Sequence, residues 1–330
     1  MQKIILAQDE KIEEISQNFG IIQSNSLPKF GVDAFLLADF ADKSLSATQI
    51  VADFGSGTGA IGLLYALKTF GKIFLIEKDE KLSRMAAKSI QLDNLSNRVQ
   101  SINRDVNQLE DTFAINSLDT IVANPPYFDS VNYAQKNTSE RRALARHEES
   151  FNLQVLVDQS QKYLKSKGKL YFIYRAERIA EVISILQASH FGITKIRFVY
   201  GKKNHEAKLV LIKANKQGSN DKIKVDKPLA IFNEKDQYTN EMKDVLHRRP
   251  YFFYVIQTAD NYLYAGTSDD VDRRFATHQA KKGAKFTKAA IHHPLKLVYR
   301  QEFSNKGEAL SFEIKFKKFS RANKEKYINL

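Results

Sequence analysis

The sequence predicts an α/β domain built on a doubly wound parallel sheet, followed by a smaller α+β domain. Two observations support this prediction. Between residues 49 and 189, short apolar runs alternate with stretches whose apolar residues recur at helical spacing, which is the pattern of strands joined by helices. After residue 250 the chain turns aromatic and basic, with 15 basic and 8 acidic residues in its last 81. We therefore predict two domains, residues 1–249 and 250–330.

Length, composition and charge limit the classes of protein to which this sequence can belong. The 330 residues are 43% hydrophobic, enough to bury substantial cores. The absence of cysteine excludes disulfides and cysteine-ligated zinc or iron–sulfur sites. The first residues lack a signal-peptide core, and no apolar run approaches the length of a membrane span, so we expect a cytoplasmic protein with no membrane partner. The net charge of +13 is typical either of a solvated basic surface or, more specifically, of a protein with a nucleic-acid partner.

The elements of the first domain follow from its apolar patterning. The predicted strands are residues 49–53, 72–76, 118–123 and 169–174, and the predicted helices are residues 60–70, 81–91 and 178–189. Helices of this length between strands imply a parallel sheet covered on both faces, with ligands bound beyond the carboxyl ends of the strands. The polar stretch 215–227 reads as a loop, and we expect the amphipathic stretch 228–247 to pack back on this domain.

A glycine-rich loop follows the first predicted strand. Asp53 ends that strand, and Gly55, Gly57 and Gly59 follow it. Glycines let a backbone turn sharply and approach a ligand that a Cβ atom would exclude. The loop lacks the Lys-Ser/Thr of a P-loop but fits a dinucleotide fingerprint, and Glu77 ends the next strand where a ribose-binding acid would stand. The loop alone does not separate NAD from S-adenosylmethionine, nor either from a purely structural turn.

The tetrapeptide Asn124-Pro125-Pro126-Tyr127 follows the strand at 118–123 and favours methyl transfer. The prolines remove two backbone donors and leave carbonyl groups free to accept. A planar amine can then donate one hydrogen to the Asn124 side chain and another to the Pro125 carbonyl, while Tyr127 stacks on its ring. This geometry aims the nitrogen lone pair at a methyl group. Asp105 is either a carboxylate that meets the cofactor adenine or a turn residue.

With these motifs in this order, the first domain resembles the class I amino-methyltransferases that use an Asn-Pro-Pro-Tyr motif. It looks most like the family that methylates N6 of adenine 37 in valine tRNA. The resemblance implies a Rossmann-like sheet, S-adenosylmethionine as cofactor and tRNA as partner. It rests on residues 21–24, 30–37, 53–64, 123–128, 141–148 and 196–200.

Two features separate the tRNA enzymes from the glutamine methyltransferases of release factors, which share the motif: the N-terminal segment ahead of the glycine loop and the basic stretch 141–148 (RRALARHE). Arg141, Arg142, Arg146 and His147 could hold tRNA phosphates or form a solvated helix face.

The second domain begins with two aromatic strands, residues 251–257 and 262–266, joined by a turn-rich loop. Asp269 and Asp270 are candidate caps for a helix over 271–280, on which Arg274 and His278 stand one turn apart. A strand at 295–299 and a helix at 308–319 complete the domain. Glu313 lies near the apolar stripe of that last helix, so its carboxylate needs a cation or a metal as partner.

Residues 251–323 resemble the GIY-YIG nuclease domain, specifically its small stand-alone bacterial subfamily. Residues 252–254 and 264–266 occupy the two signature triplets, and each keeps its tyrosine, although the first lacks its glycine. The resemblance implies that Tyr254 and Tyr264 position or deprotonate a water. It also implies that Arg274 steadies phosphate charge, that His278 assists proton transfer, and that Glu313 holds one Mg²⁺ or Mn²⁺ ion. A further family asparagine aligns with neither Asn323 nor Asn329 unambiguously.

The sequence therefore predicts a tRNA adenine-N6 methyltransferase fused to a metal-dependent endonuclease that acts on DNA or RNA. Three alternatives stay open. The first domain could methylate a protein glutamine, both domains could act on DNA as a modification and cleavage pair, and the second domain could bind nucleic acid without cleaving it. Neither the nuclease substrate nor the oligomeric state follows from the sequence.

Overall fold

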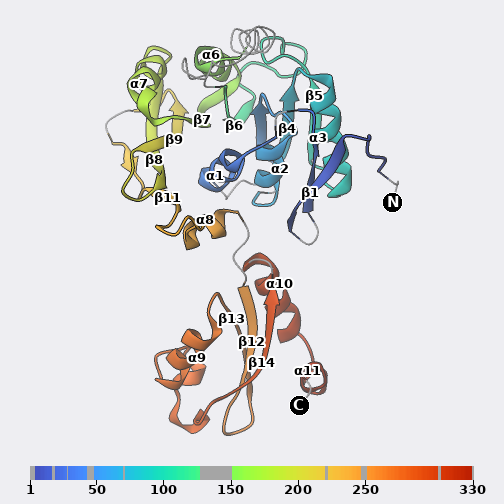
Figure 1. The fold of residues 1–330 in the computed structure, drawn as a ribbon, viewed down its shortest axis with the longest axis vertical. Helices are drawn as coiled ribbons and strands as arrows, with labels where there is room; N and C mark the ends of the chain where they lie inside the picture. Colours follow the sequence, from blue (N-terminus) through green and yellow to red (C-terminus); the bar gives the residue numbers. More distant parts are fainter. Residues whose placement is uncertain are drawn as a thin grey trace. The chain divides into compact units, whose positions relative to one another are not determined.

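A nine-stranded sheet forms the centre of the first of two units, Met1–Val245 and Leu246–Leu330 (Figure 1). In this computed structural model the strand order is β10-β8-β9-β7-β6-β3-β4-β5, with β11 paired to β8. The structure describes residues 4–16, 19–27, 29–42, 48–69, 71–126, 151–219, 222–246, 251–303 and 306–328.

The chain builds the sheet outward from β3 in two directions, which confirms the predicted doubly wound fold. It passes from β3 through β4 to β5, then returns to β6 on the other side of β3, and all five strands from β5 to β7 are parallel. β9 then runs antiparallel between β7 and β8. The bounds are β3 (Ile50–Phe54), β4 (Lys72–Glu77), β5 (Val99–Asn103), β6 (Leu118–Ala123), β7 (Leu164–Arg175), β8 (Phe191–Lys202), β9 (Ala207–Lys216), β10 (Lys224–Val225) and β11 (Leu229–Phe232).

Helices cover both faces of this sheet, as the alternation of side chains along β7 shows. Leu170 and Phe172 pack in the core with residues of α6 and α7, whereas Tyr171, which lies between them, packs edge-on against Phe40 of α1. The helices are α1 (Val32–Phe40), α2 (Ala60–Ala66), α3 (Glu80–Leu92), α6 (Leu153–Tyr163) and α7 (Ile179–Ala188). The predicted helix 60–70 ends at Ala66, because the Leu67 N–H turns back to the Leu64 carbonyl in a tighter final turn.

Two smaller additions extend the first unit. A hairpin of β1 (Glu10–Ser16) and β2 (Phe19–Ser24) is tied to α3, where Ser89 Oγ accepts from Ile22 N at 2.9 Å. The amphipathic stretch before residue 247 forms β11 and α8 (Asn240–Val245), and α8 packs on β11 and α1 as predicted. None of the helices in the described ranges is long and apolar enough to cross a membrane.

The second unit is a three-stranded antiparallel sheet with helices on both faces. Its strands lie in the order β13-β12-β14. The bounds are β12 (Tyr251–Gln257), β13 (Leu263–Ser268), α9 (Val271–Gln279), β14 (Lys296–Phe303), α10 (Lys306–Lys317) and α11 (Arg321–Tyr327). Asp270 caps α9 as predicted, since its side chain accepts from Arg273 N at 2.9 Å. The third strand runs four residues beyond its predicted end, because it continues to pair with β12 as far as Phe303.

Candidate functional site

The predicted methyltransferase residues meet at the edge of the sheet where the strand order reverses. Phe54, at the end of β3, pairs with Ile76 of β4 on one side and Ala123 of β6 on the other. A predicted site residue stands at the end of each of the three strands: Gly55 directly follows β3, Glu77 is the last residue of β4, and Asn124 directly follows β6. Because parallel strands align their carboxyl ends, three segments up to 70 residues apart in sequence come together at one edge.

The three loop glycines have different structural roles. All three have positive φ angles, 68° at Gly55, 57° at Gly57 and 81° at Gly59, which L-residues rarely adopt. A Cβ atom at Gly55 would lie 2.6 Å from the Phe151 ring, and one at Gly59 would lie 2.7 Å from Leu75. A Cβ atom at Gly57 would meet no atom of the described residues within 4 Å. Gly55 and Gly59 are therefore needed for packing, whereas no described residue crowds Gly57.

Glu77 joins the glycine loop to the neighbouring strand. One carboxylate oxygen accepts from Gly57 N at 2.8 Å and the other from Asp79 N at 2.8 Å. The residue is only 5% exposed, so these bonds hold the carboxylate in a defined position beside the loop. This is where the sequence predicted a ribose-binding acid, and that role stays a prediction.

The two aspartates predicted to bind cofactor have partners within the chain. Asp53 is fully buried beneath α2, and its Oδ2 accepts from Gly62 N at 2.9 Å. Burial, reinforced by the charge of Glu77, raises the pKa of Asp53 to about 7. Asp105 accepts from Asn107 N at 2.9 Å, which is the turn geometry that the sequence left open. Asp53 thus helps to hold α2 against the sheet, and cofactor contact by either aspartate stays a prediction.

Asn124 carries an unused acceptor at the junction of the three strands. Its side chain is half-buried, and its Oδ1 is sealed from solvent while accepting no hydrogen bond from the described residues. Pro125 beside it is buried. A buried acceptor without a donor is costly, so this oxygen is suited to a ligand N–H group. Tyr127 and the basic stretch 141–148 lie outside the described residues.

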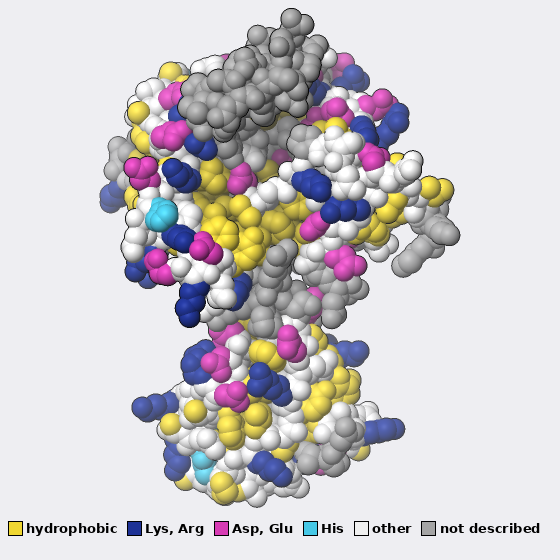
Figure 2. All heavy atoms as spheres, viewed as in Figure 1, with side chains coloured by type: hydrophobic (Ala, Val, Ile, Leu, Met, Phe, Trp, Pro, Cys, Tyr) yellow, Lys and Arg dark blue, Asp and Glu magenta, His cyan; other side chains and the backbone are white. Residues whose placement is uncertain are grey.

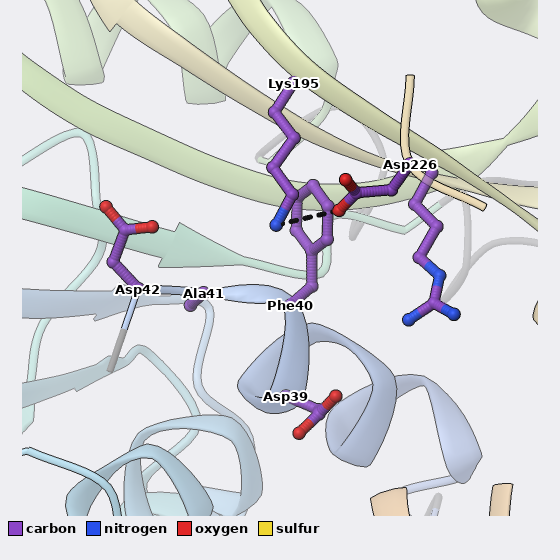
Figure 3. Close-up of a pocket in the computed structure, with 7 residues that line it drawn as sticks. Asp39, Phe40, Ala41, Asp42, Lys195 and Asp226 are labelled. Carbon is purple, nitrogen blue, oxygen red and sulfur yellow. Dashed lines mark ion pairs between the residues drawn. The ribbon is translucent and has the colours of Figure 1, made fainter. Parts of the chain in front are cut away.

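A separate pocket of about 510 Å³ lies between the end of α1, β8 and the residue after β10 (Figure 3). The Lys195 ammonium lies 3.0 Å from the Asp226 carboxylate and 4.2 Å from the centroid of the Phe40 ring. Arg197 is paired with Glu241. Because these cations are already matched to partners within the protein, we assign the pocket to structural ion pairing rather than to ligand binding.

The predicted nuclease residues gather on the α9 face of the second sheet. Tyr254 points toward α9, whereas its neighbours on β12 point toward α10. The ring centroids of Tyr254 and Tyr264 are 6.4 Å apart, and the His278 ring lies 6.0 Å from the first and 5.1 Å from the second. Arg274 lies one turn before His278, and its contact with Tyr254 raises the pKa of the guanidinium. The structure thus brings these four residues together.

A chain of hydrogen bonds orients the Tyr254 hydroxyl. The Thr287 hydroxyl donates to the Ala284 carbonyl at 3.0 Å, so its oxygen accepts from His278 Nδ1, 2.6 Å away. His278 Nε2 is then the acceptor for the Tyr254 hydroxyl at 2.9 Å. Burial lowers the pKa of His278 to about 4 and raises that of Tyr254 to about 12, although the Arg274 guanidinium opposes the latter shift. Both groups are therefore neutral near pH 7.

Sequence reasoning missed Thr287 and Gly283, two residues that hold this chain. A Cβ atom at Gly283 would lie 2.3 Å from His278 Nδ1, so only glycine leaves room for the ring. Both residues sit in the segment after α9, which has no helical or strand periodicity. Their only sequence signal is a glycine and a small hydroxyl residue within ten positions of a candidate catalytic histidine.

Glu313 lies on α10, the helix that packs on the face of the sheet opposite to Tyr254 and α9. Its side chain is 14% exposed and pairs with Lys317 at 2.5 Å, and its charge contributes to the raised pKa of Tyr254. The described residues contain no group of three or more His, Cys, Asp or Glu side chains that could hold a metal. A single carboxylate still fits a Mg²⁺-type ion, which keeps several waters and takes further oxygen ligands from a substrate phosphate.

The fold and the strand-end site are those of a Rossmann-like methyltransferase unit, and the second unit carries the tyrosine, arginine and histidine cluster described above. Residues 31–197, half of the chain, match the methyltransferase small domain family, and the chain belongs to that family. Residues 250–327 match the GIY-YIG catalytic domain. The chain thus combines a methyltransferase domain with a GIY-YIG domain.

Individual relatives agree with this division. A UPF0213 protein of Limosilactobacillus reuteri is 49% identical over 78 residues, which are 24% of this chain and 81% of that protein. UPF0213 protein YazA of Bacillus subtilis is 45% identical over 78 residues, 24% of this chain and 77% of that protein. A predicted O-methyltransferase, Atu636 of Agrobacterium tumefaciens, superposes with a TM-score of 0.51 at 22% identity, covering 65% of this chain and 95% of that one. The last likeness supports the fold alone.

Proposed function

We propose that the first unit transfers a methyl group from S-adenosylmethionine to N6 of an adenine in tRNA, and that the second unit cleaves phosphodiester bonds with a divalent metal. The observation that carries the first proposal is the Asn124 oxygen, which accepts no hydrogen bond from the described residues and follows β6, the strand paired with the one that leads into the glycine loop. A ligand amine and a cofactor placed at these two positions would meet at the edge of one sheet.

The residues fit S-adenosylmethionine by their chemistry. No described residue crowds the backbone at Gly57, and the Glu77 carboxylate beside it would accept hydroxyl hydrogen bonds of the kind a ribose offers. S-adenosylmethionine supplies an electrophilic methyl group when bound. The chain's own contribution is orientation. Asn124 Oδ1 accepts one hydrogen of the adenine amine and the Pro125 carbonyl accepts the other, which holds the nitrogen lone pair toward the cofactor side.

The choice of tRNA rests on charge and on the resemblance described above. The net charge of +13 suits a polyanionic substrate, and Figure 2 shows Lys and Arg side chains spread over the visible faces of both units. The likeness of the first unit to enzymes of adenine 37 in valine tRNA favours that position. Protein glutamine and duplex DNA are the competing substrates, because the Asn-Pro-Pro-Tyr motif serves planar amines and amides alike.

The test supplies the full chain and S-adenosylmethionine with a labelled methyl group to three substrates: total tRNA, adenine-containing duplex DNA, and a glutamine peptide. We expect label in tRNA, recovered as N6-methyladenosine by mass spectrometry of digested nucleosides. In cells lacking the gene, the same nucleoside should disappear from valine tRNA. Label found only in peptide or in DNA contradicts the tRNA proposal, as does binding of NAD without binding of S-adenosylmethionine.

For the second unit, the hydrogen-bond chain indicates how a water could be activated. Tyr254 would accept a proton from the attacking water while passing its own proton to His278 Nε2, the only lone pair of the ring left free by Thr287. Arg274 would stabilise the charge that develops on the phosphate. Glu313 would hold the Mg²⁺ or Mn²⁺ ion, which stabilises the leaving oxygen when bound.

We expect Glu313→Gln to lower cleavage at least about a hundredfold, since the amide keeps the shape of the side chain but loses the charge that binds metal. Gel assays with labelled single-stranded, duplex and branched DNA and with tRNA, in Mn²⁺ or EDTA, measure this. Lys317→Met is the matched control, because it removes the ion pair of Glu313 but keeps the carboxylate. It should retain cleavage. Cleavage that survives both EDTA and Glu313→Gln would refute the metal site.

A further inference from the structure

Next to the nuclease residues, three aromatic rings from separate segments form a continuous surface, which we call the ring platform: Tyr262, Phe286 and His292. The Phe286 and His292 rings are stacked, with centroids 4.2 Å apart, and the Tyr262 ring lies edge-on, 6.1 Å from each. Tyr262 is 58% exposed and Phe286 is 39% exposed. Two large rings are thus presented to solvent although the unit has apolar cores on both faces of its sheet.

Hydrogen bonds of His292 hold the ring platform in place. His292 Nδ1 lies 2.9 Å from both carboxylate oxygens of Asp260, and its side chain is only 13% exposed, so it forms a fixed base beneath Phe286. The Ala259 N–H donates to the His292 carbonyl at 3.0 Å, which ties this segment to the turn between β12 and β13. Both exposed rings therefore have a defined orientation.

The platform is continuous with the proposed catalytic site. The Phe286 ring is nearly parallel to that of Tyr264, at 10° with centroids 6.4 Å apart, and Tyr264 contacts Tyr254 and His278. Phe286 also begins the short helix η2 (Phe286–Lys288), which carries Thr287 of the hydrogen-bond chain. A group stacked on Phe286 would thus lie beside the residues that act on a phosphate.

Unpaired positive charge flanks the platform. Four exposed lysines lie within eight positions around Phe286, and none has an acidic partner among the described residues; they are Lys281, Lys282, Lys285 and Lys288. Some basic side chains elsewhere in the unit are paired with acids, as Arg273 is with Asp269 and Arg321 with Glu325. Exposed rings beside unpaired cations form the chemistry of single-stranded nucleic-acid binding, in which bases stack and phosphates meet lysines.

We propose that the ring platform binds an unpaired nucleobase of the nucleotide next to the phosphate that the second unit cleaves. The substrate class is therefore single-stranded or locally unpaired nucleic acid. This inference rests on the proposed nuclease function. A base within a duplex already has neighbours stacked on both faces and offers no free face to Phe286, so duplexes would contact only the lysines.

The experiment uses photo-crosslinking by the full chain in EDTA, where no metal-dependent cleavage occurs. The probes are single-stranded DNA, single-stranded RNA and duplex DNA, each with 5-iodouracil in place of thymine or uracil, and crosslinked peptides are located by mass spectrometry. We expect crosslinks at Phe286 or Tyr262 from single strands, at least about fivefold above those from the duplex, the ratio that one stacked base supports. The DNA and RNA probes distinguish the two sources of an unpaired base.

Two variants separate stacking from general attraction. Phe286→Leu keeps an apolar side chain but removes the ring, and should lower crosslinking of single strands at least about fivefold. Ile291→Ala is the control, since Ile291 is 72% exposed in the same segment without a ring, and it should crosslink as the unchanged protein does. Circular dichroism verifies that both variants fold.

Equal crosslinking yields from duplex and single strand, or an unchanged crosslinking yield in Phe286→Leu, would contradict the proposal that the ring platform binds a base. A separate cleavage assay in Mn²⁺ tests the nuclease itself. Crosslinks at the ring platform without cleavage would support base binding and contradict the nuclease function. Cleavage without crosslinks at the ring platform would support the nuclease function and contradict base binding by the platform.

Discussion

Replacing Asn124 with alanine should reduce methyl transfer to tRNA at least about a hundredfold, the scale expected when an orienting group is lost. The Asn124 oxygen is buried and accepts no hydrogen bond from the described residues, so truncation removes no contact known to stabilise the fold. It removes the acceptor that would hold the adenine amine. Because the glycine loop and Glu77 are untouched, affinity for S-adenosylmethionine should stay the same. Initial rates with labelled cofactor, and calorimetry of cofactor binding, measure the two effects separately.

Two further variants sharpen this test. Asn124→Gln keeps the amide but moves it by one methylene, so it should be nearly as defective if position is what matters. Asn233→Ala removes an asparagine whose side chain accepts from backbone N–H groups in a turn of the same unit, and it should leave turnover unchanged. An Asn124→Ala protein that methylates tRNA at the normal rate would show that the proposed amine site is wrong.

Tyr254→Phe should lower phosphodiester cleavage by about 10²–10⁴-fold, the usual contribution of a general acid or base. The ring packs among Ile256, Val271 and Leu295, and phenylalanine preserves that packing. The lost hydrogen bond to His278 costs about 1 kcal/mol of stability, far less than the catalytic effect. Cleavage rates in Mn²⁺ measure the loss, and thermal melting verifies the fold.

The matched control is Tyr299→Phe, which removes a tyrosine hydroxyl that donates to Gln301 in the same sheet and should not change cleavage. Thr287→Val tests the hydrogen-bond chain, since it removes the acceptor that keeps the proton of His278 on Nδ1. It should slow cleavage and move the pH profile, whereas Thr287→Ser should restore both. Equal activity of Tyr254→Phe and the unchanged protein would exclude Tyr254 as the base.

Features that depend on neighbours in the chain were predictable from the sequence. Helical spacing placed Arg274 and His278 on one face of α9, and Asp270 caps that helix as its side chain type predicts. The glycine loop required positive φ angles, and all three glycines have them. The order of the glycine loop, Glu77 and Asn124 along alternating strands and helices was enough to predict the doubly wound sheet and the edge at which these residues meet.

Features that depend on contacts between distant segments were decided only by the tertiary structure. The pairing of β3 with both β4 and β6 sets Gly55, Glu77 and Asn124 side by side, but strand register is a non-local property that no single segment contains. The burial of Asp53 beneath Gly62 follows from which face of β3 receives α2. Thr287 acquires its role only because the segment after α9 folds back on His278, where a buried ring nitrogen needs a partner.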